Sequence, residues 1–333
     1  MSLEIFIGAD IAPVGTAEGE MLATGLSAAL SCADARVFCL GGMPAGNDNS
    51  SPLPLHLARA AASLHPTAVN LGCADALPTD ERLKETLAAF RSAGIPAFGA
   101  GEDLDAADQP RYYVKNGVRI CFYAVSEHGG LTATERSGGV NPLNLLDLGD
   151  RIRDLRSSCE RLVVFYRGGR EGYAYPTPEM QRVCRKIAEC GASLVVCTGG
   201  RMIGSYEKWD NAVIVCGLGD FVSPVDGEAL LVKYAIGDYG AEEITFVPVL
   251  RKGGTTELAE EDRAKGILES FERRSRRVRV QGFVEARYRD YAADAKRGLL
   301  DALNAHGAGA LKRAIASESN CEPLAEGLRQ DAI

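Results

Sequence analysis

Short apolar runs rich in β-branched residues alternate along this 333-residue chain with segments of helical periodicity. This alternation restricts the fold more than any other feature, because strands that are separated by crossover helices pair in parallel. The runs with the length and composition of strands are residues 3–9, 35–41, 66–72, 118–125, 161–167, 192–198 and 211–217. We therefore expect an α/β fold.

Two predicted hairpins interrupt the alternation. Residues 111–125 contain Asn116-Gly117, the dipeptide typical of a two-residue hairpin turn, and residues 229–250 turn near 238–240. Hairpins pair their strands in antiparallel fashion, so the sheet should be mixed and differ from a purely parallel dinucleotide-binding sheet.

The predicted helices have recognisable ends. Thr177 is placed to cap a helix that has Pro178 at its first position and Gly191 just beyond its end. After Gly254 the chain becomes strongly charged and predicts long helices. We expect a first domain at residues 1–254 and a helical C-terminal extension at 255–333.

Composition excludes several classes of partner. The net charge of −8 and the pI near 5.2 do not favour nucleic acid or anionic membranes. No run approaches the roughly 18 apolar residues of a membrane span. The ten cysteines contain no CxxC pair, and the first residues lack the basic region of a signal peptide. We expect a cytoplasmic protein without membrane insertion.

Ligands of such sheets bind at the carboxyl ends of the strands. The loops there contain no phosphate-binding GxxxxGK[ST] motif and no GxSxG motif of a serine hydrolase. Cys73 with His128 as its base remains a candidate nucleophile, although a buried structural thiol is the simpler interpretation. The residues that could converge on a metal are Asp10, Asp75, Glu127, His128, Glu171 and Asp220.

The segment "YRGGREGYAYPTPEMQ", residues 166–181, resembles the "YHGGxEYYPYPSPxMQ" pattern of one branch of the CapA-type proteins of bacterial capsule and poly-γ-glutamate synthesis. "GIPAFGAGEDLDAADQP", "SEHGG", "GASLVVCTGGRMIGSYEKW" and "AVIVCGLGDF" resemble further segments of that family. The similarity extends over residues 3–224. It implies a calcineurin-like, metallophosphatase-type α/β fold: a mixed sheet core flanked by helices, followed by the C-terminal helical extension.

The positions that carry metal ligands in that family differ here. Asp10 retains the first acidic ligand, but Arg167 stands in place of the histidine before the double glycine. The HxH histidines are replaced by Gly199 and Arg201, and the asparagine of the family's GNF segment by Asp220. The family's NNH segment falls on residues 72–74, which read Gly-Cys-Ala.

Arginine stays protonated and offers no lone pair to a cation. The resemblance with these departures therefore predicts no bound metal, no cofactor and no working dinuclear centre. An anionic phosphate or carboxylate ligand, as a small molecule or polymer, could instead be held by guanidinium groups. The predicted ligand-binding residues are Asp10, Arg167, Arg170, Glu171, Arg201 and Asp220. The alternative is that the arginines pair with Asp10, Asp220 or Glu171 and fill the site.

Three functions remain open. The first is a non-catalytic CapA-like protein of capsule or polyanionic-polymer biosynthesis. The second is an enzyme of the same fold with metal-independent hydrolase or transferase chemistry, whose candidate catalytic residues are Asp10, Cys73, His128 and Glu171. The third is a scaffold that pairs with an intact CapA-like homologue or forms an oligomer.

Overall fold

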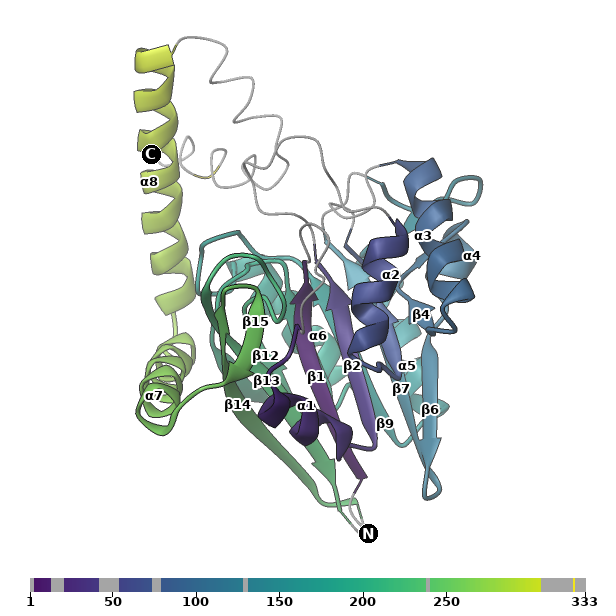
Figure 1. The fold of residues 1–333 in the computed structure, drawn as a ribbon. Helices are drawn as coiled ribbons and strands as arrows, with labels where there is room; N and C mark the ends of the chain where they lie inside the picture. Colours follow the sequence, from purple (N-terminus) through teal and green to yellow (C-terminus); the bar gives the residue numbers. More distant parts are fainter. Residues whose placement is uncertain are drawn as a thin grey trace.

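The computed structural model describes residues 3–12, 21–41, 54–73, 79–127, 131–237, 240–306 and Glu326. Two large mixed sheets pack face to face, and helices cover their outer faces (Figure 1). The layers are thus helix, sheet, sheet and helix.

The first sheet has seven strands in the order β15-β14-β13-β1-β2-β3-β4. Its parallel half joins β1 to β2, β3 and β4, while β13, β14 and β15 continue the sheet in antiparallel pairing. The bounds are β1 Leu3–Ile11, β2 Ala35–Leu40, β3 Ala68–Asn70, β4 Ala97–Phe98, β13 Gly227–Ile236, β14 Glu242–Lys252 and β15 Thr255–Leu258.

The second sheet has six strands in the order β11-β12-β10-β9-β7-β6. Its four central strands are parallel, and each edge strand pairs in antiparallel fashion with its neighbour. The bounds are β6 Arg111–Lys115, β7 Val118–Ser126, β9 Arg161–Arg167, β10 Leu194–Thr198, β11 Tyr206–Trp209 and β12 Ala212–Val215, and a separate small sheet pairs β5 Ala100–Gly101 with β8 Gly139–Val140.

Helices cover both sheets. Those packed on the first sheet are α1 Thr24–Ser31, α2 Pro54–Ser63 and α3 Asp80–Ser92. Those packed on the second are α5 Leu148–Ser157 and α6 Pro178–Glu189. The remaining helices are the short α4 Leu104–Ala107 and the C-terminal α7 Glu261–Val278 and α8 Phe283–His306. Among the helices of the described segments, none has the length and hydropathy needed to cross a bilayer.

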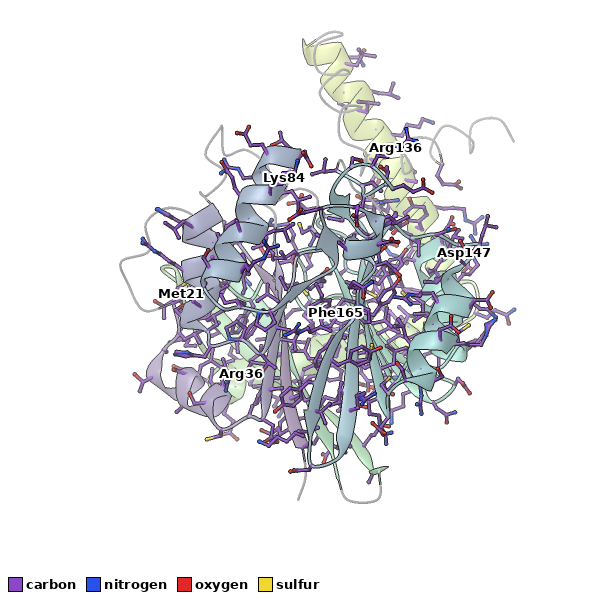
Figure 2. All side chains as sticks on the ribbon, turned by 90° about the vertical axis from the view of Figure 1, so that its right-hand side faces the viewer. Met21, Arg36, Lys84, Arg136, Asp147 and Phe165 are labelled. Carbon is purple, nitrogen blue, oxygen red and sulfur yellow. The ribbon has the colours of Figure 1, made fainter. Side chains whose placement is uncertain are left out.

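The main core lies between the two sheets because successive strand residues face opposite sides. Along β9, Val163 and Phe165 point into the space between the sheets, while Leu162, Val164 and Tyr166 face the helices. Phe165 lies in the middle of the molecule (Figure 2). Its ring centroid is 5.6 Å from that of Phe98. This core fixes the distance between the sheets and hence between their carboxyl-end loops.

The predicted fold class is confirmed, and the local signals identified most of the elements. Asn116 and Gly117 form the first hairpin turn with φ of 55° and 79°, and Thr177 accepts a hydrogen bond from the backbone N–H of Met180 at 3.1 Å. The second predicted hairpin is formed by β13 and β14, although residues 238 and 239 of its turn lie outside the described part.

One local prediction was wrong. Residues 255–258, assigned from the sequence to the helical extension, form the edge strand β15, and the helical part begins at Glu261. The reason is tertiary, because β15 pairs with β14 and buries Thr256 to 1% exposure. A four-residue polar strand carries too little periodicity to be seen in the sequence.

Candidate functional site

Four charged side chains from both sheets meet at the carboxyl ends of the central strands. Asp10 lies near the end of β1 and Arg167 ends β9, while Arg201 follows β10 and Asp220 follows β12. We call these four residues the ion-pair site. It lies where open α/β sheets bind their ligands.

Two ion pairs define the site. Arg167 donates from Nη1 to Asp10 Oδ2 at 2.7 Å, and Arg201 donates from Nη2 to Asp220 Oδ2 at 2.6 Å. The side chains of Asp10 and Asp220 are 3% and 5% exposed, and those of Arg167 and Arg201 are 11% and 14% exposed. Such short, desolvated contacts between charged groups are among the strong hydrogen bonds. Of the two interpretations drawn from the sequence, the structure shows the arginines paired with the acids.

Glu171 joins the site from its outer side. Its Oε1 lies 3.5 Å from Nε of Arg201, and its side chain is 54% exposed. Arg201 therefore contacts two carboxylates, the buried one of Asp220 and the solvated one of Glu171. The longer and more exposed contact is the weaker of the two, because solvent screens it.

Burial and charge together change the acidity of Asp220. Burial is the larger cause and the nearby negative charge of Asp10 the smaller one; together they raise its pKa to about 6 against the opposing effects of Arg201, Arg251 and Arg167. Because the pKa of Asp220 is raised overall, desolvation and repulsion by Asp10 have a larger effect than the attraction of the three guanidinium groups. Asp220 thus changes protonation close to neutral pH.

Glycines make room for these side chains. Gly199 has φ of +107°, and a Cβ built there would lie 3.0 Å from the carbonyl oxygen of Gly168 and 3.2 Å from Nε of Arg167. A Cβ on Gly41 would lie 2.6 Å from Cβ of Asp10. Any side chain at position 199 would therefore have to displace Arg167, and the backbone there favours glycine in any case.

The other predicted site residues lie apart. Arg170 is 1% exposed and packs towards α8, where it lowers the pKa of Tyr288 against the stronger effect of burial. Cys73 is buried at 1% exposure, as the structural interpretation of this thiol expects. His128 and Asp75 lie outside the described residues.

Two neighbours of the site could not be predicted from the sequence. Arg251 on β14 donates from Nη1 to the backbone oxygen of Asp220, and from Nε to that of Val225 at 3.0 Å. The thiol of Cys39 on β2 is buried, which raises its pKa, and Asp10 raises it further. Arg251 sits in a hairpin far along the chain, so no local signal connects it with Asp220.

The described residues of the ion-pair site do not fit the dinuclear metal centre that the fold type implies. Asp10 and Asp220 each give Oδ2 to an arginine, and their Oδ1 atoms are buried without a hydrogen-bond partner among the described residues. Two free carboxylate oxygens are too few ligands for two cations. Across the described parts of the chain, no group of three or more histidine, cysteine, aspartate and glutamate side chains could hold a metal.

The chain has a mixed α/β fold of the metallophosphatase type. A solved structure with a similar fold is that of the NAD nucleotidase NadN of Haemophilus influenzae, with a TM-score of 0.50 and 10% sequence identity. The likeness covers 82% of this chain and 56% of that one, and at this identity it shows the fold alone.

The predicted family resemblance is confirmed, and part of the chain is similar to the CapA-type capsule synthesis proteins. Residues 78–225 match the family described as bacterial capsule synthesis protein PGA_cap. The chain is 25% identical over 176 residues to the capsule biosynthesis protein CapA of Bacillus anthracis. It is 24% identical over 174 residues to the PGA biosynthesis protein CapA of Bacillus subtilis.

The matched segments cover 50% of this chain in both alignments, and 43% and 46% of these relatives. The chain thus matches less than half the length of either curated relative.

Proposed function

We propose that this protein is a cytoplasmic, non-catalytic CapA-like component of capsule or poly-γ-glutamate biosynthesis that binds an anionic ligand or a partner protein. The family relationship supports the pathway class. The ion-pair site supports the absence of metal-dependent hydrolysis, because Arg167 and Arg201 occupy positions of family histidines and bind Asp10 and Asp220 internally. This pairing is the observation that carries the proposal.

A metallophosphatase uses two cations to activate water and to clamp the phosphoryl oxygens. Guanidinium groups supply fixed positive charge but do not generate a metal-bound hydroxide. We therefore expect the purified protein to contain no stoichiometric manganese, iron or zinc by elemental analysis and to leave p-nitrophenyl phosphate intact.

The double variant Arg167→His with Arg201→His provides a matched comparison, since it returns two imidazoles beside Asp10 and Asp220. It should bind more zinc than the parent protein under the same dialysis conditions. Stoichiometric metal in the parent protein, lost on Asp10→Asn, would overturn the proposal.

A ligand anion would enter at Glu171. This carboxylate is the exposed and more distant partner of Arg201, so a phosphate or carboxylate group can replace it without breaking the pair with Asp220. Glu171→Gln removes the competing charge and should tighten the binding of inorganic phosphate or of a γ-glutamyl oligomer in calorimetric titrations. Glu179→Gln, on exposed α6 surface, is the control. Equal affinities in all three proteins would argue against anion binding at Arg201.

The second candidate function is metal-independent catalysis, and one observation favours it. Asp220 has its pKa raised to about 6, which suits a general acid or base near neutral pH. Turnover of any phosphoester or peptide substrate that disappears in Asp220→Asn, while Arg201 remains paired with Glu171, would favour this alternative.

The scaffold hypothesis stays a proposal as well. Co-purification with an intact CapA-like homologue would support it. We expect neither nucleic acid nor a membrane among the partners, given the acidic net charge of −8.

A further inference from the structure

The C-terminal helix α8 packs its first turns against the loop that carries Glu171. The ring of Tyr291 stacks on that of Tyr173 with centroids 4.5 Å apart, and Tyr288 lies 6.1 Å from the same ring. Phe283 meets Tyr175 edge to face at 5.2 Å. The far half of α8 extends beyond the sheets (Figure 1). The contact with the loop therefore belongs to the near half of the helix.

The buried residues of α8 follow one face of the helix. Val284, Tyr288 and Ala292 are spaced by four residues and are 1%, 5% and 0% exposed. Tyr291 lies beside this row and is half-buried. The aromatic side chains of α8 thus form part of the surface on which the loop rests.

The same loop is tied to the turn that holds Arg201. The backbone N–H of Gly172 donates to the carbonyl oxygen of Gly200 at 3.1 Å, and that of Tyr173 donates to Arg170 at 3.0 Å. Arg201 itself has φ of +58°. Residues other than glycine adopt this left-handed backbone conformation only when the surrounding structure holds them in it. Hydrogen bonds therefore connect the loop that carries Tyr173 to the strained turn at Arg201.

The charges around Tyr291 show how near α8 comes to the site. Burial raises the pKa of Tyr291, Arg170 lowers it, and Glu171 raises it. For Tyr288, burial again dominates, with Arg170 lowering the pKa and Glu127 raising it. Both tyrosines thus lie within electrostatic reach of the loop's charged residues.

We infer that Tyr291 of α8, through its stack on Tyr173, is a positioning residue that holds Glu171 against Arg201 and so sets the shape of the ion-pair site. The C-terminal extension then acts as a wall of the site. This inference goes beyond the proposed function, since it rests on the loop geometry and holds whether or not an anion binds.

The test uses the full chain and needs no ligand. The Nε–Hε signal of Arg201 can be recorded by NMR, assigned by its loss in Arg201→Lys, in the parent protein and in Tyr291→Ala, Tyr291→Phe and Tyr112→Ala. Tyr112 is 41% exposed on the edge strand β6 and serves as the control for loss of a tyrosine. All spectra are taken well below the melting temperature of each protein.

In Tyr291→Ala we expect the Arg201 Nε–Hε signal to shift and its exchange with solvent to accelerate by about tenfold, because local opening frees the contact with Glu171. Tyr291→Phe keeps the stacked ring and should restore the parent signal, and Tyr112→Ala should leave it unchanged. A purely stabilising role would lower the melting temperature of Tyr291→Ala without moving this signal, and that result would overturn the inference. Failure of the anion titrations would not affect it.

Discussion

Among single residues, Asp220 offers the most direct electrostatic test of the ion-pair site. Its folded pKa of about 6 exceeds the value of about 3.9 expected in the unfolded chain. The folded protein therefore binds this proton more tightly. Its contribution to stability is present below about pH 4 and is lost as the pH rises through 6.

We expect Asp220→Asn to remove this contribution from the pH dependence. The free energy of unfolding of the parent protein, relative to that of Asp220→Asn, should fall between pH 4 and 6 by up to about 3 kcal/mol. Urea denaturation at several pH values measures both curves. Asp154→Asn, at an exposed position of α5, is the control and should run parallel to the parent. Parallel curves for Asp220→Asn would show that the pKa of Asp220 is not raised.

Between secondary-structure elements, a further ion pair with a buried carboxylate joins α6 to β11. Arg185 reaches Glu207 with Nε at 3.1 Å and Nη2 at 2.6 Å, and its guanidinium lies 4.0 Å from the centre of the Trp209 ring. The side chain of Glu207 is 3% exposed, whereas that of Arg185 is 25% exposed. Without Arg185, the charge of Glu207 would be buried and unpaired. Without Glu207, the charge of Arg185 would still be partly solvated.

This difference predicts unequal effects of two substitutions. Arg185→Met leaves the buried Glu207 charge without its partner and should cost about 3–5 kcal/mol of unfolding free energy. Glu207→Gln removes the buried charge, and Arg185 keeps solvent and the Trp209 ring, so the loss should be smaller. Urea denaturation of both variants and of the double variant decides the order. A larger loss in Glu207→Gln would contradict this account.

At the level of the complete chain, the C-terminal helix α7 contributes to the main core. Ile267 and Phe271 of α7 are 3% and 2% exposed and belong to the cluster between the sheets. The Phe271 ring lies 4.8 Å from Phe246 and 5.3 Å from Tyr206. The boundary at residue 254 that the sequence suggested remains a prediction, and these contacts provide a test of it.

A chain truncated after residue 254 should lose its cooperative thermal transition. Removing one buried phenylalanine costs about 3–5 kcal/mol, a large share of the 5–15 kcal/mol that typically stabilises a domain. A chain truncated after residue 281 keeps α7 and should still melt cooperatively, at a lower temperature. Calorimetry of both chains measures this. Cooperative melting of the shorter chain would establish residues 1–254 as an independent domain.

The local structure and the chemistry available at the strand ends could be predicted from the amino-acid sequence. Asn116-Gly117 specified a turn and Thr177 a helix start, because these preferences depend on neighbouring residues alone. The arginines at 167 and 201 were visible from the sequence, as was the loss of the family's histidines. Family resemblance then indicated the fold.

Which charged side chains meet depends on contacts between distant segments. Asp10 and Arg167 are 157 residues apart and touch because the packed core aligns the carboxyl ends of two separate sheets. The pairing of Arg201 with Asp220, the stacking of α8 on Tyr173 and the added strand β15 likewise depend on long-range contacts. Neighbouring residues do not encode such contacts, because their free energy arises only when distant segments bury surface together.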